Sequence, residues 1–527
     1  MGKRKPLYKV IPYSKTHLVD FLCNDCDGHR GTIEKKSHIT YFDGYLQKVE
    51  AKTFIAEFEY IDRDYLEDFA SYYVRSFYNY KRYCIRLHFF RQVFTKKNFE
   101  ELLSGSTGLF NAESAQDNYL GFIVVKPLPK TIIGRTCLIP YPSDGERHFE
   151  TIRKYNVNLF GISLSVKSIA YQEQDSVVAA CASSAIWSAF QSSGIIFHHN
   201  IPSPVEITKA ATVYFPYSTR HFPNEGLTPE QMAHAIRNVS LEPFIFESSS
   251  FDRLTGCLYS YLKGEIPLVL GIQIHELNAH GNSIRFLGNH AVTITGYNLG
   301  GKPQKFDTSR YKIKNETFLL KSSRIQKLYV HDDQVGAFAR MALDGKTVGL
   351  RDTDGTVVQN FSLSTDFSRK NITRAIPELL LIPLYHKIRI PYSSILEIIY
   401  GFDNYIKVIA NGTKSPLPEL EWNIYLSTVT AFKENITKTT PLLPKYRKEL
   451  LLTRMPRFLW RASCEVDNNA SIEFVFDATD IEQGSIYIRH VIYNDKLSSN
   501  FKNLASLIKT ELMSDIHIRK IFEDLKK

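Results

Sequence analysis

The residues of this chain with the clearest capacity for chemistry lie between Tyr171 and Gly194, in the stretch YQEQDSVVAACASSAIWSAFQSSG. Cys181 stands at the start of a predicted helix and is flanked by small residues. Backbone amides and the positive end of a helix dipole stabilise a thiolate at that position, and small neighbours let a substrate carbonyl approach. The pattern is also typical of a core cysteine, because cysteine is among the most buried residue types. Taken alone, the stretch leaves both interpretations open.

A nucleophilic thiol needs a general base, a group that orients the base, and donors for an oxyanion. His290 begins the apolar run HAVTITGYN, which we expect to be a strand whose end faces the start of the Cys181 helix. A lone histidine beside a strand is usually structural. A second strand-like run, LYVHDDQVG, leads into Asp332 and Asp333. The order of these residues predicts a thiol, an imidazole and a carboxylate acting together.

This combination resembles the papain-like cysteine peptidases, and most closely the bacterial branch that includes the double-glycine leader peptidases. The order Gln, Cys, His and then Asp carries the resemblance over about residues 170–340, with a strand of the form HAVxxxGY after the cysteine helix. The resemblance implies that Cys181 is the nucleophile and His290 the general base and later acid. It also implies that Asp332 or Asp333 orients the imidazole, Asp332 being aligned with the expected end of its strand.

The oxyanion donor that the resemblance implies is the side chain of Gln174, beside the backbone amide of Cys181. The glutamine of this family usually stands six residues before the cysteine, but Asp175 occupies that position here. Gln174 lies one residue further from the cysteine, and Gln172 lies three further. Either the loop carries one extra residue or another group is the donor.

Three other patterns suggest metal ligands, but their spacing does not favour a metal. In HELNAHG, His275 and His280 are five residues apart, about 500° around a helix, so a hairpin loop is expected rather than a zinc-protease helix. CNDCDGH, from Cys23 to His29, lacks the second ligand pair of a structural zinc and reads as an acidic turn. Asp477 and Asp480 beside a strand turn are expected to be solvated. We therefore expect no bound metal.

The distribution of charge along the chain indicates which classes of partner to expect. The formal net charge is +10, but the basic residues are spread along the chain among acidic ones, which favours a mixed-charge surface over a nucleic-acid site. No glycine-rich phosphate loop is present, so no nucleotide cofactor is expected. We expect a protein or peptide substrate, and the flanking regions offer surface for a protein partner.

The sequence also predicts the cellular location of the protein. The first residues, MGKRKPLYKV, are not followed by the apolar region of a secretory signal, and no apolar run approaches the roughly 20 residues that cross a bilayer. The seven cysteines are scattered and odd in number, which favours free thiols. These observations predict a cytoplasmic protein without a membrane span.

Local patterns predict the elements that position the candidate residues. The helix of Cys181 is expected from about Ala180 to Phe190, with Gly194 as its stop. Capping boxes at SPVE and TPEQ predict helices at about 204–211 and 229–238. The run IPLVLGIQI predicts a strand that precedes HAVTITGYN, with HELNAHG between them.

The length and patterning of the chain predict a multidomain α+β protein. We expect an N-terminal α+β region at 1–110, a catalytic domain at 111–345 and a C-terminal α+β region at 346–527. The resemblance implies a papain-like core for the catalytic domain, in which the cysteine helix packs on an antiparallel sheet that bears the histidine and the aspartate.

Three functions are compatible with these residues. The leading hypothesis is a cysteine peptidase or thiol hydrolase that acts through an acyl-enzyme on a peptide or isopeptide bond. The second uses the same triad for amide exchange, as transglutaminases, deamidases and acyltransferases of similar fold do. The third is a protein-binding adaptor with a degenerate site, which the displaced glutamine favours. A separation above about 6 Å between Cys181 and His290 would favour the adaptor.

Overall fold

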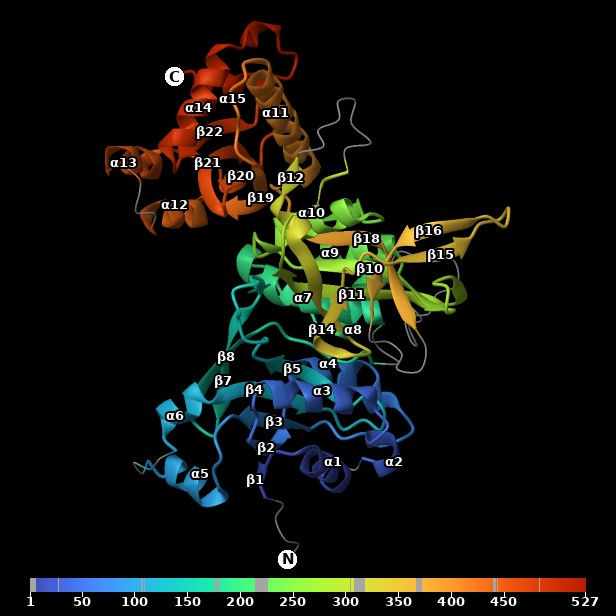
Figure 1. Ribbon diagram of the computed structural model, residues 1–527. Coiled ribbons are helices and arrows are strands. Elements are labelled where there is room, and N and C mark those ends of the chain that lie inside the picture. Colours follow the sequence, from blue (N-terminus) through green and yellow to red (C-terminus); the bar gives the residue numbers. More distant parts are fainter. Residues whose placement is uncertain are drawn as a thin grey trace, which may run out of the picture. The chain divides into compact units, whose positions relative to one another are not determined.

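The protein is described by a computed structural model, in which the chain forms two compact units (Figure 1). Unit 1 comprises Met1–Ile245, Pro267–Asn298 and Lys327–Pro383, and unit 2 comprises Phe246–Ile266, Leu299–Gln326 and Leu384–Lys527. The expected regions 1–110, 111–345 and 346–527 remain predictions. The structure describes residues 6–26, 28–105, 108, 110–175, 180–213, 226–303, 305–307, 318–365, 372–438, 442, 444–482 and 484–527.

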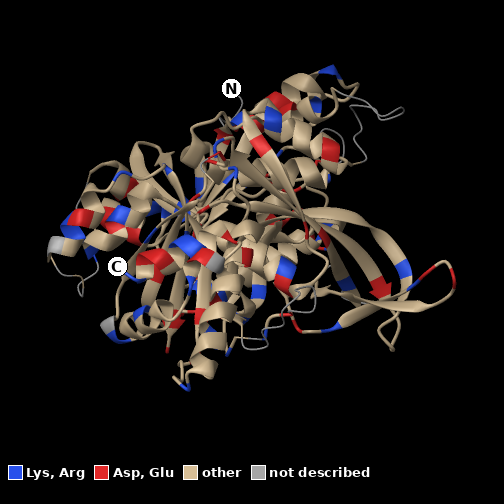
Figure 2. Ribbon diagram, turned by 90° about the horizontal axis from the view of Figure 1, so that it is seen from above, with Lys and Arg blue, Asp and Glu red and all other residues tan. Residues whose placement is uncertain are grey.

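Both units mix helices with mainly antiparallel sheets, so the predicted α+β class is confirmed. Basic and acidic residues are interspersed along the helices and strands (Figure 2). Within the ranges given above, no helix has both the length and the apolar character needed to cross a membrane.

The first sheet of unit 1 has its strands in the order of the sequence. These are β1 (Tyr8–Pro12), β2 (Thr53–Tyr60), β3 (Cys84–Phe90), β4 (Tyr119–Val125) and β5 (Ile133–Leu138), each antiparallel to the next, so the sheet has strands on both sides of residue 110. Apolar side chains of α1 (Lys15–Asn24) and α3 (Ser37–Lys48) share one core with the strands, among them Phe21, Phe42 and Phe89.

Two helices of this part begin at side-chain caps. α4 (Arg63–Ser71) starts after Asp62, whose side chain accepts the backbone N–H of Tyr65. α5 (Lys96–Leu103) starts after Thr95 in a capping box with Asn98. The smaller elements of unit 1 are α2 (Arg30–Ile33), the 3-10 turn η1 (Tyr73–Arg75), α6 (Ala112–Asp117), β6 (Arg147–His148), β7 (Arg153–Leu159), β8 (Ile162–Ser168) and β9 (Leu241–Glu247).

The second sheet of unit 1 carries the candidate base and carboxylates. Its strand order is β14-β13-β11-β10-β18-β17, formed by Gly336–Ala342, Ile325–Asp332, Ser283–Leu299, Leu268–Leu277, Thr373–Tyr385 and Leu363–Ser364. β10 and β11 form the predicted antiparallel hairpin, and HELNAHG supplies the end of β10 and its turn. β15 (Thr347–Arg351) and β16 (Val357–Phe361) form an antiparallel hairpin whose connection contains Asp354 and Gly355.

His290 lies inside β11 rather than at its start, because the strand begins at Ser283. The first half of β11 is largely exposed although it contains Ile284, Phe286 and Leu287, and His290 is where the strand becomes buried. The run HAVTITGYN is therefore the buried half of a longer strand.

The cysteine helix, α7 (Cys181–Phe197), packs against this sheet: Thr293 of β11 donates a 2.6 Å hydrogen bond to the carbonyl of Ala185. The predicted stop at Gly194 is wrong. Gly194 lies within the helix, where a Cβ would stand 2.7 Å from the Ile201 side chain, so the glycine permits close packing. The helix ends at His198, which adopts the left-handed conformation at φ 57°. The predicted helices α8 (Pro204–Ala211) and α9 (Pro229–Asn238) are confirmed.

Unit 2 is a five-stranded sheet with helices on both faces. The strands, in spatial order, are β12 (Leu319–Leu320), β19 (Glu421–Thr428), β20 (Phe458–Val466), β21 (Asn469–Asp477) and β22 (Tyr487–Ile492). Phe402 of α11 packs against Trp422 and Phe474 on one face, and Phe432 of α12 packs with Leu459 on the other. The helical elements are α10 (Phe251–Leu262), η2 (Lys321–Arg324), α11 (Tyr392–Gly412), α12 (Val429–Lys438), α13 (Pro444–Leu452), α14 (Asp495–Ser506), η3 (Thr510–Leu512) and α15 (Ile516–Leu525).

Candidate functional site

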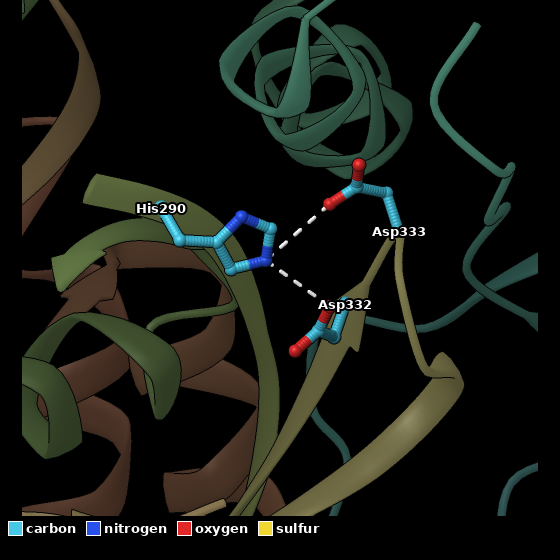
Figure 3. A group of neighbouring side chains, drawn as sticks. All are labelled: His290, Asp332 and Asp333. Atoms are coloured by element: carbon cyan, nitrogen blue, oxygen red, sulfur yellow. Dashed lines mark hydrogen bonds and ion pairs between the residues drawn. The ribbon is translucent and has the colours of Figure 1, made fainter. Parts of the chain in front are cut away.

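The candidate site is centred on the His290 imidazole, which faces two adjacent carboxylates (Figure 3). Nε2 lies 3.1 Å from Oδ1 of Asp332 and 3.4 Å from Oδ1 of Asp333. The three side chains are only 3%, 1% and 4% exposed, respectively, so these interactions are shielded from water. His290 comes from β11 and Asp332 from the end of β13, which are neighbouring strands. Strand pairing thus brings together residues that are 42 positions apart in the sequence.

Cys181 is the first residue of α7. Its side chain is hydrogen-bonded to that of His290. Because the carboxylates occupy Nε2, Nδ1 is the ring nitrogen left for the thiol. Cys181 is partly exposed, whereas His290 and both aspartates are buried. The thiol is therefore the accessible member of the set of thiol, imidazole and carboxylates.

The surroundings of His290 favour the protonated imidazole. Burial by itself lowers the pKa of His290, but the charge of Asp332 and the hydrogen bonds with Asp332 and Cys181 outweigh it. The net effect raises the pKa well above its ordinary value. A charged imidazolium next to a thiol stabilises the thiolate form of the nucleophile.

Asp332 is the better placed of the two aspartates to orient the ring. Its Oδ1 lies closer to Nε2, and the same oxygen accepts the backbone N–H of Gln334 at 3.0 Å. Burial raises the pKa of Asp333; the positive charge of His290 opposes the rise and the charge of Asp332 adds to it, giving a value of about 7. The assignment of the orienting residue remains a prediction, and these distances favour Asp332.

The turn that holds both aspartates is anchored by residues that the sequence analysis did not identify. The backbone carbonyl of Asp333 accepts hydrogen bonds from Nε2 of His38, at 2.8 Å, and from the hydroxyl of Tyr171, at 3.3 Å. His38 lies in α3, 295 residues away in the sequence, so no local signal could have marked it. Helix α3 and the segment at Tyr171 thus help to position the end of β13.

The residues before the cysteine are only partly accounted for. Asp175, at the position expected for the oxyanion glutamine, is buried, and its carboxylate accepts a 2.6 Å hydrogen bond from the hydroxyl of Tyr73. Gln172 is buried and Gln174 is half-buried in an irregular segment. Residues 176–179, which join this segment to the helix, lie outside the described residues. The oxyanion role of Gln174 therefore remains a prediction.

The start of α7 offers backbone donors beside the sulfur. The first hydrogen bond of the helix runs from the N–H of Ser184 to the carbonyl of Ala180, at 3.1 Å. The N–H groups of the three residues before Ser184 therefore have no acceptor within the helix. One of these belongs to Cys181 itself, as an oxyanion donor beside the nucleophile would require.

Among the described residues, His290, Asp332 and Asp333 are also the one group whose ligand atoms are close enough together to hold a metal ion. Of CNDCDGH, Asp27 lies outside the described residues. Asp477 and Asp480 accept backbone N–H groups of their own turns, from Thr479 and Glu482. No protein-family model matches the chain, and no curated protein is significantly similar to it.

Proposed function

We propose that this protein is a thiol hydrolase of the cysteine-peptidase type, with Cys181 as nucleophile, His290 as general base and acid, and Asp332 as the orienting group. One observation carries the proposal: the His290 imidazole is hydrogen-bonded to the Cys181 side chain and, through Nε2, to Asp332. A nucleophile, a base and an orienter in mutual hydrogen-bond contact form the arrangement that acyl transfer requires.

The elements around the triad support a papain-like core within this proposal. The cysteine begins a helix that packs on a sheet, through the hydrogen bond between Thr293 and Ala185. The histidine and the aspartate come from two neighbouring strands of that sheet. This matches the arrangement implied by the resemblance to papain-like peptidases.

The chemistry follows from the positions of the groups. The Cys181 thiolate attacks the carbonyl carbon of a peptide, isopeptide or related acyl bond, and the N–H of Cys181 donates to the developing oxyanion. The imidazolium of His290 passes its Nδ1 proton to the leaving amine, which departs and leaves a thioester. Neutral His290 then takes a proton from water as the water attacks, which releases the acid and restores the pair of thiolate and imidazolium.

The same intermediate permits transfer to an amine instead of water, as in transglutaminases and acyltransferases. Adding a primary amine to the reaction separates the two outcomes. If an amide product forms in place of the acid, the protein is an acyltransferase. If only the acid forms, the protein is a hydrolase. The hydrogen bond between Cys181 and His290 supports either reaction over the adaptor hypothesis, which a large separation of the two groups would have favoured.

The proposal is tested by measuring how fast iodoacetamide alkylates each cysteine, with mass spectrometry of the peptides. Cys23 and Cys26 are the internal standards, because they are partly exposed like Cys181, whereas the other four cysteines are buried. We expect Cys181 to react at least about tenfold faster near neutral pH, because its thiolate is stabilised. Equal rates at the three cysteines would refute the proposal.

A histidine variant makes the test specific. His290→Ala should bring the alkylation rate of Cys181 down to that of Cys23 and Cys26. His275→Asn is the matched control, because His275 lies on the adjacent strand β10 and bonds Ser283 rather than the cysteine. Equal effects of the two variants would show that His290 has no special role.

A further inference from the structure

The side-chain cluster His290, Asp332 and Asp333 contains two carboxylates, whereas the proposed chemistry uses only one. One carboxylate is enough to orient an imidazole, and Asp332 is already hydrogen-bonded to Nε2. Asp333 is 4% exposed, and its Oδ1 lies 3.4 Å from the same nitrogen. The three candidate ligand atoms all lie within 4.8 Å of one another.

Asp333 is the member of this cluster that needs an explanation. Neither oxygen of its carboxylate has a hydrogen-bond partner in another residue of the part of the chain that the structure describes. Burying a carboxylate without hydrogen bonds is costly, and buried charges are normally paired or bound to a metal. Both Asp333 and Asp332 point at one ring nitrogen, so the two carboxylates and the imidazole converge on a common point (Figure 3).

We infer that His290, Asp332 and Asp333 form a binding site for one divalent first-row transition-metal ion, and that the bound ion switches off the thiol chemistry. An imidazole nitrogen with two carboxylate oxygens suits Zn²⁺ or a similar ion, whereas Mg²⁺ and Ca²⁺ prefer ligand sets made of oxygen. Three protein ligands leave the fourth position of a tetrahedral zinc ion to water. The metal site itself does not depend on the proposed function; the switching does.

The switch follows from which ring nitrogen carries a proton. Nε2 must offer a lone pair to the metal, so a neutral ring that binds the ion through Nε2 carries its one proton on Nδ1. A ring in that state has no lone pair for a proton from water, so His290 no longer serves as the base that hydrolyses the acyl-enzyme.

Equilibrium dialysis of the full-length protein against Zn²⁺ tests the site. We expect one ion per chain, and a dissociation constant at least about tenfold higher for Asp333→Asn, which keeps the shape but removes the charge of one ligand. Cys181→Ala, and Cys23→Ser combined with Cys26→Ser, should each bind one ion as the wild type does. Wild-type affinity in Asp333→Asn, or loss of the ion in either cysteine variant, would overturn the inference.

Two further measurements complete the test. If Asp333→Asn does not fold, the absorption spectrum of Co²⁺ bound to the wild type tests the site instead. Ligand-field bands without a thiolate-to-cobalt charge-transfer band support the site. An intense charge-transfer band shows a cysteine ligand and overturns it. For the switch, Zn²⁺ should slow steady-state hydrolysis of p-nitrophenyl acetate at least about tenfold in the wild type. Zn²⁺ binding without slower hydrolysis overturns the switch, whereas an unreactive Cys181 in metal-free protein counts against the proposed function alone.

Discussion

Asp332 holds His290 through Nε2 of the ring: its Oδ1 lies 3.1 Å from Nε2 and is itself fixed by the N–H of Gln334 at 3.0 Å. Asp333 lies further from the ring, at 3.4 Å, and has no comparable anchor for its carboxylate in the described chain. The two adjacent acids therefore occupy different positions, and their variants should behave differently.

Asp332→Asn should slow acylation of Cys181 by p-nitrophenyl acetate by about a hundredfold or more in metal-free protein, because the amide no longer stabilises the imidazolium. Asp333→Asn should slow it by less than about tenfold, since the bond between Asp332 and His290 remains. The measurement is the burst of p-nitrophenol released per chain, timed by stopped flow. A larger loss in Asp333→Asn than in Asp332→Asn would make Asp333 the orienting residue.

Gly336→Ala should disturb the site through the turn after Asp332. Gly336 has a φ of +155°, and a Cβ there would stand 2.2 Å from the ring of Tyr41. We expect a loss of about 2 kcal/mol or more in the free energy of unfolding, and slower alkylation of Cys181, because the turn must move.

Gly345→Ala is the matched control for Gly336→Ala. Gly345 also has a positive φ, +74°, but a Cβ there would meet nothing within 4 Å. It should cost only about 1 kcal/mol of backbone strain and leave the alkylation rate of Cys181 unchanged. Equal effects of the two variants on both readouts would contradict the steric explanation.

Tyr73→Phe should destabilise unit 1. The Tyr73 hydroxyl donates a 2.6 Å hydrogen bond to the buried carboxylate of Asp175, and Lys126 lies 3.9 Å from the same oxygen. Removing the hydroxyl leaves a buried charge short of one donor, which costs about 1–3 kcal/mol. The change is measured by denaturant unfolding, with Tyr78→Phe as the control, because Tyr78 is 73% exposed. If both variants unfold alike, the bond to Asp175 contributes nothing measurable.

His88 should make unit 1 less stable in mild acid. The imidazole is fully buried in β3, between the hydroxyl of Tyr119 and the carboxylate of Glu57. Burial lowers its pKa to about 4, with the hydrogen bond to Glu57 opposing and the charge of Arg86 adding to the shift. The unfolded chain has the ordinary pKa of about 6.5, so it binds the proton first as the pH falls.

The stability linked to His88 is thus complete above about pH 6.5 and is lost as the pH falls through about 4. The loss should amount to roughly 3 kcal/mol over that window. His88→Gln should flatten the dependence of the free energy of unfolding on pH between 6.5 and 4. His17→Gln, at an exposed position, should leave the dependence as in the wild type. An unchanged pH dependence in His88→Gln would refute the assignment.

The sequence by itself determined most of the elements, because their signals are local. The capping boxes at Ser203 and Thr228 satisfy backbone N–H groups within three residues, so they mark α8 and α9 wherever those helices pack. The spacing in HELNAHG was enough to favour a hairpin over a helix for the same reason. The class, α+β with antiparallel sheets, followed from these elements.

The tertiary structure decided what depends on distant contacts. The end of α7 moved from Gly194 to His198, because Gly194 is used for packing against Ile201. The pairing of β11 with β13 determines that Asp332 is closer to His290 than Asp333 is, and no local pattern separates two adjacent aspartates. Hydrogen bonds between side chains act over only a few ångströms. Residues far apart in the sequence, such as Cys181 and His290, therefore interact only once the fold has brought the Cys181 helix next to these strands.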